Sequence, residues 1–523
     1  MLTQFEREAN LSDLMDYHAR TRPEAEMLVF ESRRWTWGEG DRIVNRIAHG
    51  LIGLGVGRND KVAVLAATSP EYFFTFWGII RAGACAVPLS GMASAESLEL
   101  MIADSGAKVL FASEKTMDLI GRIDARLDGI VTGGRIAYDF AAPGWRRFDD
   151  WIAAEPDTNP GVAIDPLDDF NIIYSSGTTG VPKGILHDHR TRISYWATRD
   201  AFAYGPDTRL IVSTPLYSNT TLFALLPALA WGGATILLPR SDTENFLRLA
   251  ERERATHTMQ VPVQYHRLHD FPDFGGYDLS SFKWKFCTSA PLRPAFKTWL
   301  ITAWPGGFTE IYGMTEGGVG CFLNAHEYPD KVHTVGFARE GSELRVVDEA
   351  MNEVPRGEIG ELIGWSAYMM TGYYNKPDKT TESRWTDKEG RVWQRSGDMG
   401  RMDEDGFIVL LDRAKDMIIS GGFNIYAADL EAELLKHPAV DDAAVIAVPS
   451  EDWGETPLGL VVLKPGASAS GDDIRGWANE RLGKLQRLSA VELRDTLPRS
   501  TIGKLLKREL REPYWAGMER RVG

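Results

Sequence analysis

Residues 174–184 read YSSGTTGVPKG, a stretch built from small residues, hydroxyl side chains and one lysine. Glycines allow a backbone to approach a ligand closely and to present its N–H groups. The hydroxyls add hydrogen-bond donors, and Lys183 adds a compact positive charge. Together these groups suit a polyphosphate, and a plain Ser/Gly linker is the alternative interpretation. The stretch is not a Walker A loop, because Pro182 and Gly184 flank the lysine.

Other short stretches rich in small residues recur along the chain, and all but the first of them carry charged side chains. These stretches are TSAPL (288–292), IYGMTE (311–316), SGD (396–398), DRAKDMIISGG (412–422) and PRSTIGK (498–504). If each residue is considered alone, Glu316 is best interpreted as a surface carboxylate and Lys504 as a solvated cation. Asp398 and Arg413 are then best interpreted as salt-bridge partners. Their chemistry becomes specific only when the stretches are considered together.

Two histidines follow the first stretch, at positions 187 and 189. A spacing of two would suit a pair of metal ligands, but no cysteine or third ligand lies nearby in the sequence. We therefore expect His187 and His189 to pack or to form hydrogen bonds.

The stretch SSGTTGVPKG resembles the phosphate loop of the adenylate-forming superfamily, which includes acyl-CoA synthetases, peptide-synthetase adenylation domains and firefly luciferase-type enzymes. The five other stretches match further motifs of this superfamily in the same order, from roughly residue 25 to the end. The resemblance implies ATP, Mg²⁺ and CoA as cofactors and a reaction in two halves. A carboxylate first attacks the α-phosphate of ATP, and a thiol then attacks the resulting acyl-adenylate and releases AMP.

The resemblance implies a role for each matched residue. Lys504 would bridge the attacking carboxylate and the phosphate, Thr315 would contact the α-phosphate, and Glu316 with Thr179 would hold Mg²⁺. Tyr312 would stack on adenine, and Asp398 and Arg413 would bind the ribose. The full set implied to bind ATP or AMP is Ser175, Ser176, Gly177, Thr178, Thr179, Gly180, Lys183, Ser289, Ala290, Pro291, Glu310, Ile311, Tyr312, Gly313, Asp398, Arg413 and Lys415.

The family motifs also imply a CoA site and a hinge. Gly421 and Gly422 would line the path of the thiol, where a pantetheine arm needs close backbone approach, and Arg240 matches a family position that contacts CoA. Asp412 resembles the residue about which the C-terminal domain rotates between the two half-reactions. Such a hinge absorbs a large change in backbone dihedral angles.

The acid substrate is less clearly encoded. The stretch PLYSNTT (215–221) has Ser218 where many family members have histidine, and Ile311 replaces the glycine of plant hydroxycinnamate ligases. Ser218, Asn219 and Thr220 would hydrogen-bond a ring substituent, or they would cap a helix that begins near residue 221. The residues expected at the acid are Tyr217, Ser218, Asn219, Ala290 and Ile311. An aromatic acid, such as a hydroxycinnamate or benzoate, is the leading expectation, and a medium-chain aliphatic acid is the alternative.

Other functional classes remain open from the sequence. One alternative is an enzyme that loads its acyl group onto a carrier protein, and since no carrier domain is appended, this loading would occur in trans. Another alternative is an enzyme that oxidises its adenylate, as luciferases do. A relative that only binds its ligands is disfavoured, because the motif residues expected for catalysis are all present, namely Lys183, Glu316, Asp398, Arg413 and Lys504.

Alternating strand-like and helix-like segments across residues 60–260 predict α/β layers with largely parallel strands. From about residue 336 the segments become short strands and turns. We expect a large N-terminal domain (1–411) of layered α/β subdomains plus a β-barrel-like subdomain. A small, mobile α+β C-terminal domain (412–523) would follow. Its helices are expected over 429–436 and 472–482, and its strands over 443–448 and 458–463.

Composition excludes several classes of protein. The net charge of −15 argues against non-specific nucleic-acid binding. The three cysteines form no C-x-x-C pair, so neither a zinc motif nor a disulfide framework is expected. The apolar stretch 211–239 is interrupted by prolines and glycines and reads as strand, helix and strand of a core instead of a membrane span. With no signal peptide evident at the N-terminus, a cytoplasmic enzyme is expected, and a homodimer is left open.

Overall fold

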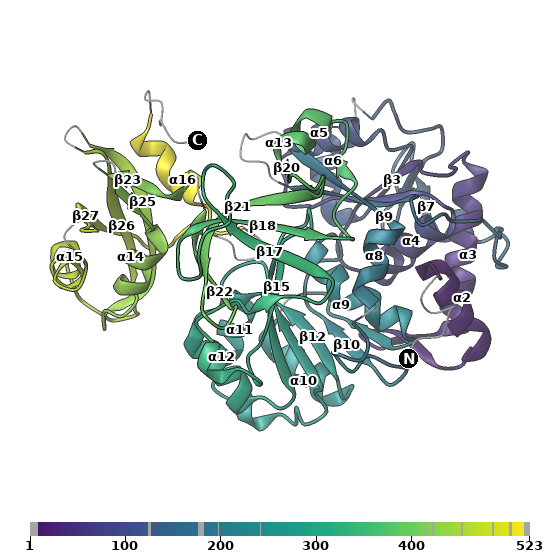
Figure 1. The fold of residues 1–523 in the computed structure, drawn as a ribbon. Coiled ribbons are helices and arrows are strands. Elements are labelled where there is room, and N and C mark those ends of the chain that lie inside the picture. Colours follow the sequence, from purple (N-terminus) through teal and green to yellow (C-terminus); the bar gives the residue numbers. More distant parts are fainter. Residues whose placement is uncertain are drawn as a thin grey trace. The chain divides into compact units, whose positions relative to one another are not determined.

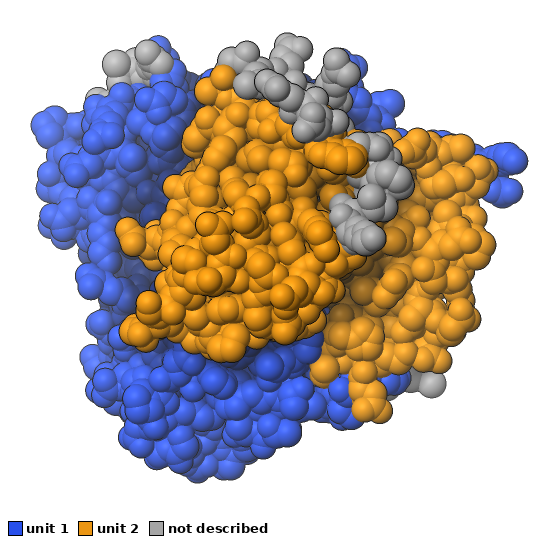
Figure 2. Space-filling view, turned by 90° about the vertical axis from the view of Figure 1, so that its left-hand side faces the viewer, with its two compact units in different colours: residues 1–318, 324–329, 365–394 blue, residues 319–323, 330–364, 395–523 orange. Residues whose placement is uncertain are grey.

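The computed structural model describes residues 9–123, 127–175, 182–196, 198–240, 242–413, 416–420, 423–450, 453–483, 486–500 and 505–516, with the backbone alone at 412, 413, 423 and 424. The chain forms two compact units (Figure 2). Unit 1 contains residues 1–318, 324–329 and 365–394, and unit 2 contains residues 319–323, 330–364 and 395–523. The expected boundary at Asp412 stays a prediction, because strand β22 (Ile408–Arg413) runs through it.

Unit 1 contains an eight-stranded sheet in the order β19-β9-β8-β4-β3-β5-β6-β7. Neighbours from β8 to β7 are parallel, and β9 is antiparallel to both β8 and β19. The strands are β3 (Lys61–Leu65), β4 (Cys85–Pro88), β5 (Val109–Ala112), β6 (Arg135–Ala137), β7 (Arg146–Arg147), β8 (Asp169–Ser175), β9 (Lys183–Asp188) and β19 (Gly372–Tyr373).

The second sheet of unit 1 runs in the order β14-β13-β12-β10-β11-β1-β2 and is parallel except for β2. Its strands are β1 (Glu26–Phe30), β2 (Arg33–Thr36), β10 (Arg209–Val212), β11 (Ala234–Leu237), β12 (His257–Gln260), β13 (Trp284–Cys287) and β14 (Gly307–Gly313). The two sheets confirm the prediction of α/β layers with largely parallel strands.

Helices connect these strands and cover the sheets (Figure 1). Those of unit 1 are α2 (Leu11–Thr21), α3 (Trp37–Gly53), α4 (Pro70–Arg81), α5 (Ala95–Ser105), α6 (Met117–Ile123), α7 (Phe148–Ile152), α8 (His189–Trp196), α9 (Asn219–Ala230), α10 (Thr243–Arg252), α11 (Pro262–His269), α12 (Pro294–Ala303) and α13 (Pro377–Glu382). The short strand β20 (Arg384–Thr386) also belongs to this unit. Helix α9 packs against α8 and against strands β10, β11 and β12, so its N-terminal end lies beside the carboxyl ends of parallel strands.

Local sequence explains where several helices begin. Thr36 and Glu39 form a capping box at the start of α3, and Ser69 caps α4 with Pro70 as its first residue. Helix α10 is capped by Asp242, whose Oδ1 accepts a hydrogen bond from the Asn245 N–H at 2.7 Å.

Unit 2 begins with short strands. β15 (Gly320–Asn324) pairs with β16 (Phe337–Ala338), and a sheet in the order β17-β18-β21 carries β22 on β21. Its strands are β17 (Ser342–Val347), β18 (Gly360–Ser366), β21 (Val392–Met402) and β22 (Ile408–Arg413). We expect the β-barrel-like subdomain in this part of the chain. Its described strands form an open sheet in the order given above.

The C-terminal part of unit 2 has its own sheet in the order β24-β23-β26-β25, with β27 beside β26. The elements are β23 (Ile418–Ser420), β24 (Phe423–Ile425), α14 (Ala427–Leu434), β25 (Val440–Ser450), β26 (Gly454–Leu463), α15 (Gly471–Asn479), β27 (Ala490–Leu493) and α16 (Lys507–Arg511). A core that includes Ile418, Leu430, Val445, Val461 and Ile474 joins the helices to this sheet. The expected α+β domain is therefore confirmed, with element limits shifted by a few residues.

Among the described residues, no helix is both long and apolar enough to cross a membrane. The apolar stretch 211–239 contains the end of β10, helix α9 and strand β11, as expected. Pro227 lies inside α9 and does not end it.

Candidate active site

The two strands that flank the first stretch place its ends side by side. Ser175 at the end of β8 is paired with Lys183 at the start of β9. The Nζ of Lys183 lies 5.2 Å from the centroid of the Tyr373 ring. The loop residues Ser176, Gly177, Thr178, Thr179 and Gly180 lie outside the described part of the chain, so their role as a phosphate loop stays a prediction.

Tyr373 also contacts the expected magnesium ligand. Its hydroxyl donates a hydrogen bond to Oε1 of Glu316 at 2.7 Å, and the Met370 N–H donates to the Glu316 carbonyl oxygen at 2.8 Å. Burial and the negative charge of Glu316 raise the pKa of Tyr373, so this hydroxyl keeps its proton. The structure thus brings both Lys183 and Glu316 next to one tyrosine, the first near its ring and the second at its hydroxyl.

Sequence analysis did not single out Tyr373. It is placed by strand β19, in which Tyr373 pairs with Ile185 of β9. Side chains two residues apart on a strand share one face, so Lys183 and Ile185 point the same way and Lys183 meets the tyrosine ring. No local motif marks this residue, and only the pairing of β19 with β9 reveals it.

The Thr315 backbone is held by a histidine. The Nε2 of His187 lies 2.7 Å from the carbonyl oxygen of Thr315. The ring is buried, and burial together with the nearby Arg192 guanidinium lowers the pKa of His187 well below its usual value. His187 therefore forms hydrogen bonds as expected, and no group of three or more potential metal ligands is found among the described residues.

Hydrogen bonds join the 288–292 stretch to its neighbours. The Thr288 hydroxyl donates to the carbonyl oxygen of Ile311 at 2.7 Å, and the Ser289 and Thr220 hydroxyls lie 2.7 Å apart. Ser289 has φ of 82°, which is rare for a residue with a side chain and indicates a constrained turn. The stretches expected at adenine and at the acid are therefore connected through side chains. Ala290 is partly buried and Pro291 is exposed next to this turn.

The side chain of Glu310, a residue expected at the nucleotide, has partners within the protein. Its side chain is buried, pairs with the Lys297 ammonium and accepts a hydrogen bond from the Leu292 N–H at 2.9 Å. The carboxylate thus holds the 288–292 stretch against strand β14. Glu310 itself could therefore contact a nucleotide only through its backbone. Its neighbours Ile311 and Tyr312 are partly buried, and Gly313 is exposed.

The 215–221 stretch contains the start of α9. Ser218 is the N-cap of this helix and accepts a hydrogen bond from the Thr220 N–H at 3.2 Å. The Thr221 hydroxyl donates to the Pro215 carbonyl oxygen at 2.6 Å, and the Asn219 Oδ1 accepts a hydrogen bond from Arg192 at 2.7 Å. Ser218 thus has the capping geometry that we considered as an alternative to substrate binding. Tyr217 is partly buried beside it.

The remaining site residues lie in unit 2 or far from this region in sequence. Asp398 of β21 pairs with Arg413 of β22, so the two residues expected at the ribose are directly opposite each other on neighbouring strands. The Asp398 N–H donates to Oγ of Ser396 at 2.9 Å. Arg240 is exposed just after β11. Lys415, Gly421, Gly422 and Lys504 lie outside the described residues.

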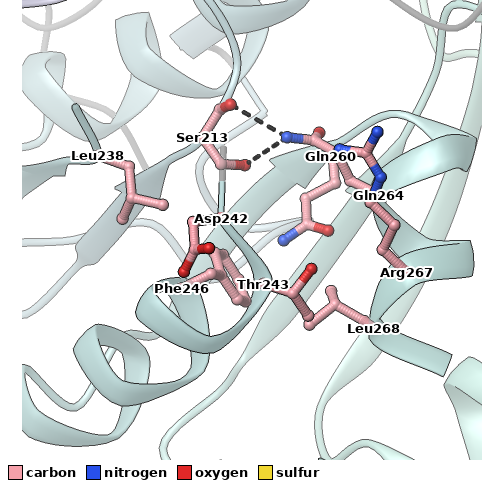
Figure 3. A pocket seen from close by; sticks show the side chains of 9 residues that line it. All are labelled: Ser213, Leu238, Asp242, Thr243, Phe246, Gln260, Gln264, Arg267 and Leu268. Atoms are coloured by element: carbon pink, nitrogen blue, oxygen red, sulfur yellow. Dashed lines mark hydrogen bonds between the residues drawn. The ribbon is translucent and has the colours of Figure 1, made fainter. Parts of the chain in front are cut away.

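A small polar pocket lies at the carboxyl ends of β10 and β12, between α10 and α11 (Figure 3). The Gln264 Nε2 donates to both oxygens of Ser213, at 3.0 and 3.2 Å. Oε1 of Gln260 is buried there without a hydrogen-bond partner in the described structure. A second pocket is apolar and is lined by Phe73, Phe76, Trp77, Leu216, Leu222 and Leu225. Leu216 and Leu222 flank the start of α9, so this apolar pocket adjoins the stretch expected at the acid.

The described residues fit the magnesium nucleotide that the motifs imply. Mg²⁺ bound with a nucleotide needs one or two carboxylates and takes its other ligands from phosphates and water. Glu316 would supply such a carboxylate, and Lys183 would supply a cation for the phosphates.

Comparisons with known proteins identify relatives of this chain. Residues 15–374 match the model of the AMP-binding enzyme family, and residues 429–504 match the AMP-binding enzyme C-terminal domain. Feruloyl-CoA synthase from an Amycolatopsis species is 32% identical over 95% of this chain and 97% of its own. The long-chain-fatty-acid–CoA ligase FadD13 of Mycobacterium tuberculosis is 30% identical over 97% of this chain and 99% of its own.

A solved structure agrees as well. The anthranilate–CoA ligase AuaEII in complex with anthranoyl-AMP superposes with a TM-score of 0.84 and 25% identity, covering 97% of each chain. The chain belongs to the AMP-binding enzyme family, in the acyl-CoA synthetase branch of the adenylate-forming superfamily. Its class is that of the AMP-forming acid–CoA ligases, whose substrates include ATP and CoA.

Proposed function

We propose that the chain converts an aromatic acid, of the hydroxycinnamate or benzoate type, into its CoA thioester. Ferulate and coumarate are the acids that we expect it to accept. The observation that carries this proposal is the start of α9, where the partly buried side chains of Tyr217 and Asn219 place an aromatic ring next to a polar amide. Such a site suits a flat apolar ring that bears a polar substituent. The feruloyl-CoA synthase relative supports the same class of acid.

The proposed chemistry has two balanced steps. A carboxylate oxygen of the acid attacks the α-phosphorus of ATP, and the bond from that phosphorus to the pyrophosphate oxygen breaks, so pyrophosphate leaves. The thiol sulfur of CoA then attacks the acyl carbon, and the bond to AMP breaks. AMP leaves as its phosphate anion, and the thiol loses its proton to solvent or base.

In the first step this chain would act through charge. Lys183 would bind the phosphates, Glu316 with Thr179 would hold Mg²⁺, and Thr315 would contact the α-phosphate. When bound, Mg²⁺ supplies charge neutralisation on the phosphate oxygens. Tyr373 positions Glu316, because its hydroxyl already donates to Oε1. Lys504 would complete this arrangement when the C-terminal domain turns toward the acid.

In the second step we propose that the C-terminal domain rotates about Asp412. Gly421 and Gly422 would then line the path of the thiol, and Arg240 would contact CoA from the N-terminal side. Asp398 and Arg413 would bind the ribose, and Lys415 would contribute to nucleotide binding. Pairing of β21 with β22 supports the ribose assignment, since it places positions 398 and 413 opposite each other.

A second acid class has support of its own. A medium-chain aliphatic acid is the alternative, and the FadD13 relative is a long-chain-fatty-acid–CoA ligase. Loading of a carrier protein in trans is the alternative for the acceptor. A panel of aromatic and aliphatic acids, assayed for AMP release with CoA or with a holo-carrier protein, tests these possibilities. Highest kcat/KM on a hydroxycinnamate or benzoate with CoA is the expected result, and highest kcat/KM on an alkanoate would overturn the aromatic proposal.

We also propose a reducing compartment, the cytoplasm, as the site of action, and a homodimer as a candidate oligomeric state. Cys85, Cys287 and Cys321 are all free and buried, which suits a compartment without disulfide formation. Sedimentation at several protein concentrations measures the oligomeric state.

A further inference from the structure

Arg192 is a buried cation surrounded by neutral hydrogen-bond acceptors. It lies on α8 and its side chain is inaccessible to solvent. Nε and one terminal nitrogen donate to Oδ1 of Asn171, at 2.9 and 2.7 Å. The other terminal nitrogen donates to the Tyr195 hydroxyl at 2.9 Å and to Oδ1 of Asn219 at 2.7 Å. No carboxylate forms an ion pair with Arg192 in the part of the chain that the structure describes.

A guanidinium can only donate hydrogen bonds, so every neighbour must turn an acceptor toward it. His187 illustrates the consequence. Its Nδ1 lies 3.2 Å from Arg192 and must accept, whereas its Nε2 faces the Thr315 carbonyl oxygen and must donate. Arg192 therefore fixes the tautomer of His187, and through it the hydrogen bond that holds the Thr315 backbone.

The same rule fixes the orientation of Asn219. The two ends of an asparagine amide have nearly the same shape and differ in being donor or acceptor. Because Arg192 occupies Oδ1, the NH₂ group of Asn219 must point the other way. Asn219 is partly accessible to solvent, and its NH₂ group has no hydrogen-bond partner among the described residues. The first residue of α9 thus presents N–H donors, and it cannot present an acceptor while Arg192 is in place.

We propose that Arg192 is a positioning residue that makes Asn219 a hydrogen-bond donor toward the acyl group, so that the preferred acid carries an acceptor at that point. This inference rests on the proposed function in one respect, namely that the acyl group lies at the start of α9. Suitable acceptors are a methoxyl, hydroxyl or carbonyl oxygen. An acid that offers only a donor there leaves the NH₂ group facing another donor and is rejected.

The test compares acids of nearly equal shape. 4-Methoxycinnamate offers an acceptor, 4-ethylcinnamate offers neither donor nor acceptor, and 4-aminocinnamate offers mainly donors. With the wild-type enzyme, kcat/KM in pyrophosphate exchange should be about tenfold higher for 4-methoxycinnamate than for 4-ethylcinnamate, because the ethyl group leaves the NH₂ donor of Asn219 without a partner. Equal values for these two acids would overturn the inference.

Three variants separate positioning from a general loss of structure. Asn219→Asp turns one carboxylate oxygen to Arg192 and the other to the substrate. This variant should therefore favour 4-aminocinnamate over 4-methoxycinnamate. Arg192→Met frees the amide of Asn219 to turn. The ratio of kcat/KM for 4-methoxycinnamate to that for 4-aminocinnamate should therefore fall toward unity. Tyr195→Phe removes another partner of Arg192 without touching Asn219, and it should keep the wild-type ratio. An unchanged ratio in a folded Asn219→Asp enzyme would contradict the proposal even if Arg192→Met fails to fold.

Failure of the proposed function would be visible separately. If the wild-type enzyme activates alkanoates and no cinnamate or benzoate, the aromatic substrate is wrong. The comparison is then made between alkanoates that carry a methoxy group and their ethyl isosteres. A preference for the methoxy acids that is lost in Asn219→Asp would support the role of Arg192, and the absence of any preference would refute it.

Discussion

The hydroxyl of Tyr373 donates a hydrogen bond to the carboxylate of Glu316 at 2.7 Å, although 57 positions separate the two residues. The same ring lies 5.2 Å from the ammonium of Lys183. One side chain therefore contacts both the expected magnesium ligand and the cation expected at the phosphates. The relationship depends on β19 joining the sheet beside β9, because that pairing brings Tyr373 next to the strand that Lys183 begins.

Removing this hydroxyl should weaken nucleotide use. In Tyr373→Phe, Glu316 loses a donor that holds it in place, and a hydrogen bond to a charged group contributes about 1.5–3 kcal/mol. We expect KM for Mg·ATP to rise by about tenfold in pyrophosphate exchange, with the KM for the acid little changed. Tyr374→Phe is the matched control, since it alters the adjacent ring. Equal effects of the two substitutions would show that Tyr373 does not act through Glu316.

The charge of Lys183 should matter for the same nucleotide. Lys183→Ala removes one cation from the phosphates, so adenylation should slow most at limiting ATP, by at least about tenfold. Lys183→Arg keeps the charge and should restore part of the loss. Kinetics that are unchanged at both limiting and saturating ATP would remove Lys183 from the phosphate site.

Ser218 should contribute stability more than selectivity. Its cap at the start of α9 predicts that Ser218→Ala lowers the free energy of unfolding by about 1 kcal/mol. Ser218→Asp keeps a capping oxygen and should retain most of that stability. Urea denaturation measures both variants. A tenfold change in preference between hydroxylated and unsubstituted acids in Ser218→Ala, without loss of stability, would instead place the hydroxyl at the substrate.

Stability should fall in mild acid because a buried histidine resists protonation. His257 is inaccessible to solvent, and burial lowers its pKa to about 4. The unfolded chain binds this proton near pH 6.5, so it holds more protons than the native state between about pH 6.5 and 4. The free energy of unfolding should therefore fall as pH decreases through this range, by up to about 1.4 kcal/mol per pH unit from this histidine. His257→Gln should reduce that slope in urea denaturation at pH 7.5, 6 and 5, and a slope equal to the wild type would assign the loss to other groups.

The sequence was sufficient to predict the α/β layers, whereas the roles of the motif residues stay predictions. Alternating apolar segments predicted parallel α/β sheets, because buried parallel strands need helices to cover them, and the phosphate stretch does lie between two paired strands. Side-chain partners far apart in the sequence could not be predicted. Glu310 matched a motif position, yet its contact with Lys297 depends on how α12 packs beside β14. Asn219 and Arg192 meet only because α8 and α9 pack together.

The central claim is that this chain first makes an acyl-adenylate and only then a thioester, with Lys504 acting in the first step alone. The most direct measurement follows both half-reactions in wild type and in Lys504→Ala with an acid from the panel, using ATP labelled in the α-phosphate to detect the adenylate and in the γ-phosphate to detect pyrophosphate. The account predicts adenylate and pyrophosphate before CoA is added, with formation slowed by on the order of a hundredfold in Lys504→Ala. Pre-made adenylate and CoA should still give thioester at a near-normal rate in that variant. Formation of ADP and phosphate, or an equal slowing of both steps in a normally folded Lys504→Ala enzyme, would contradict the account.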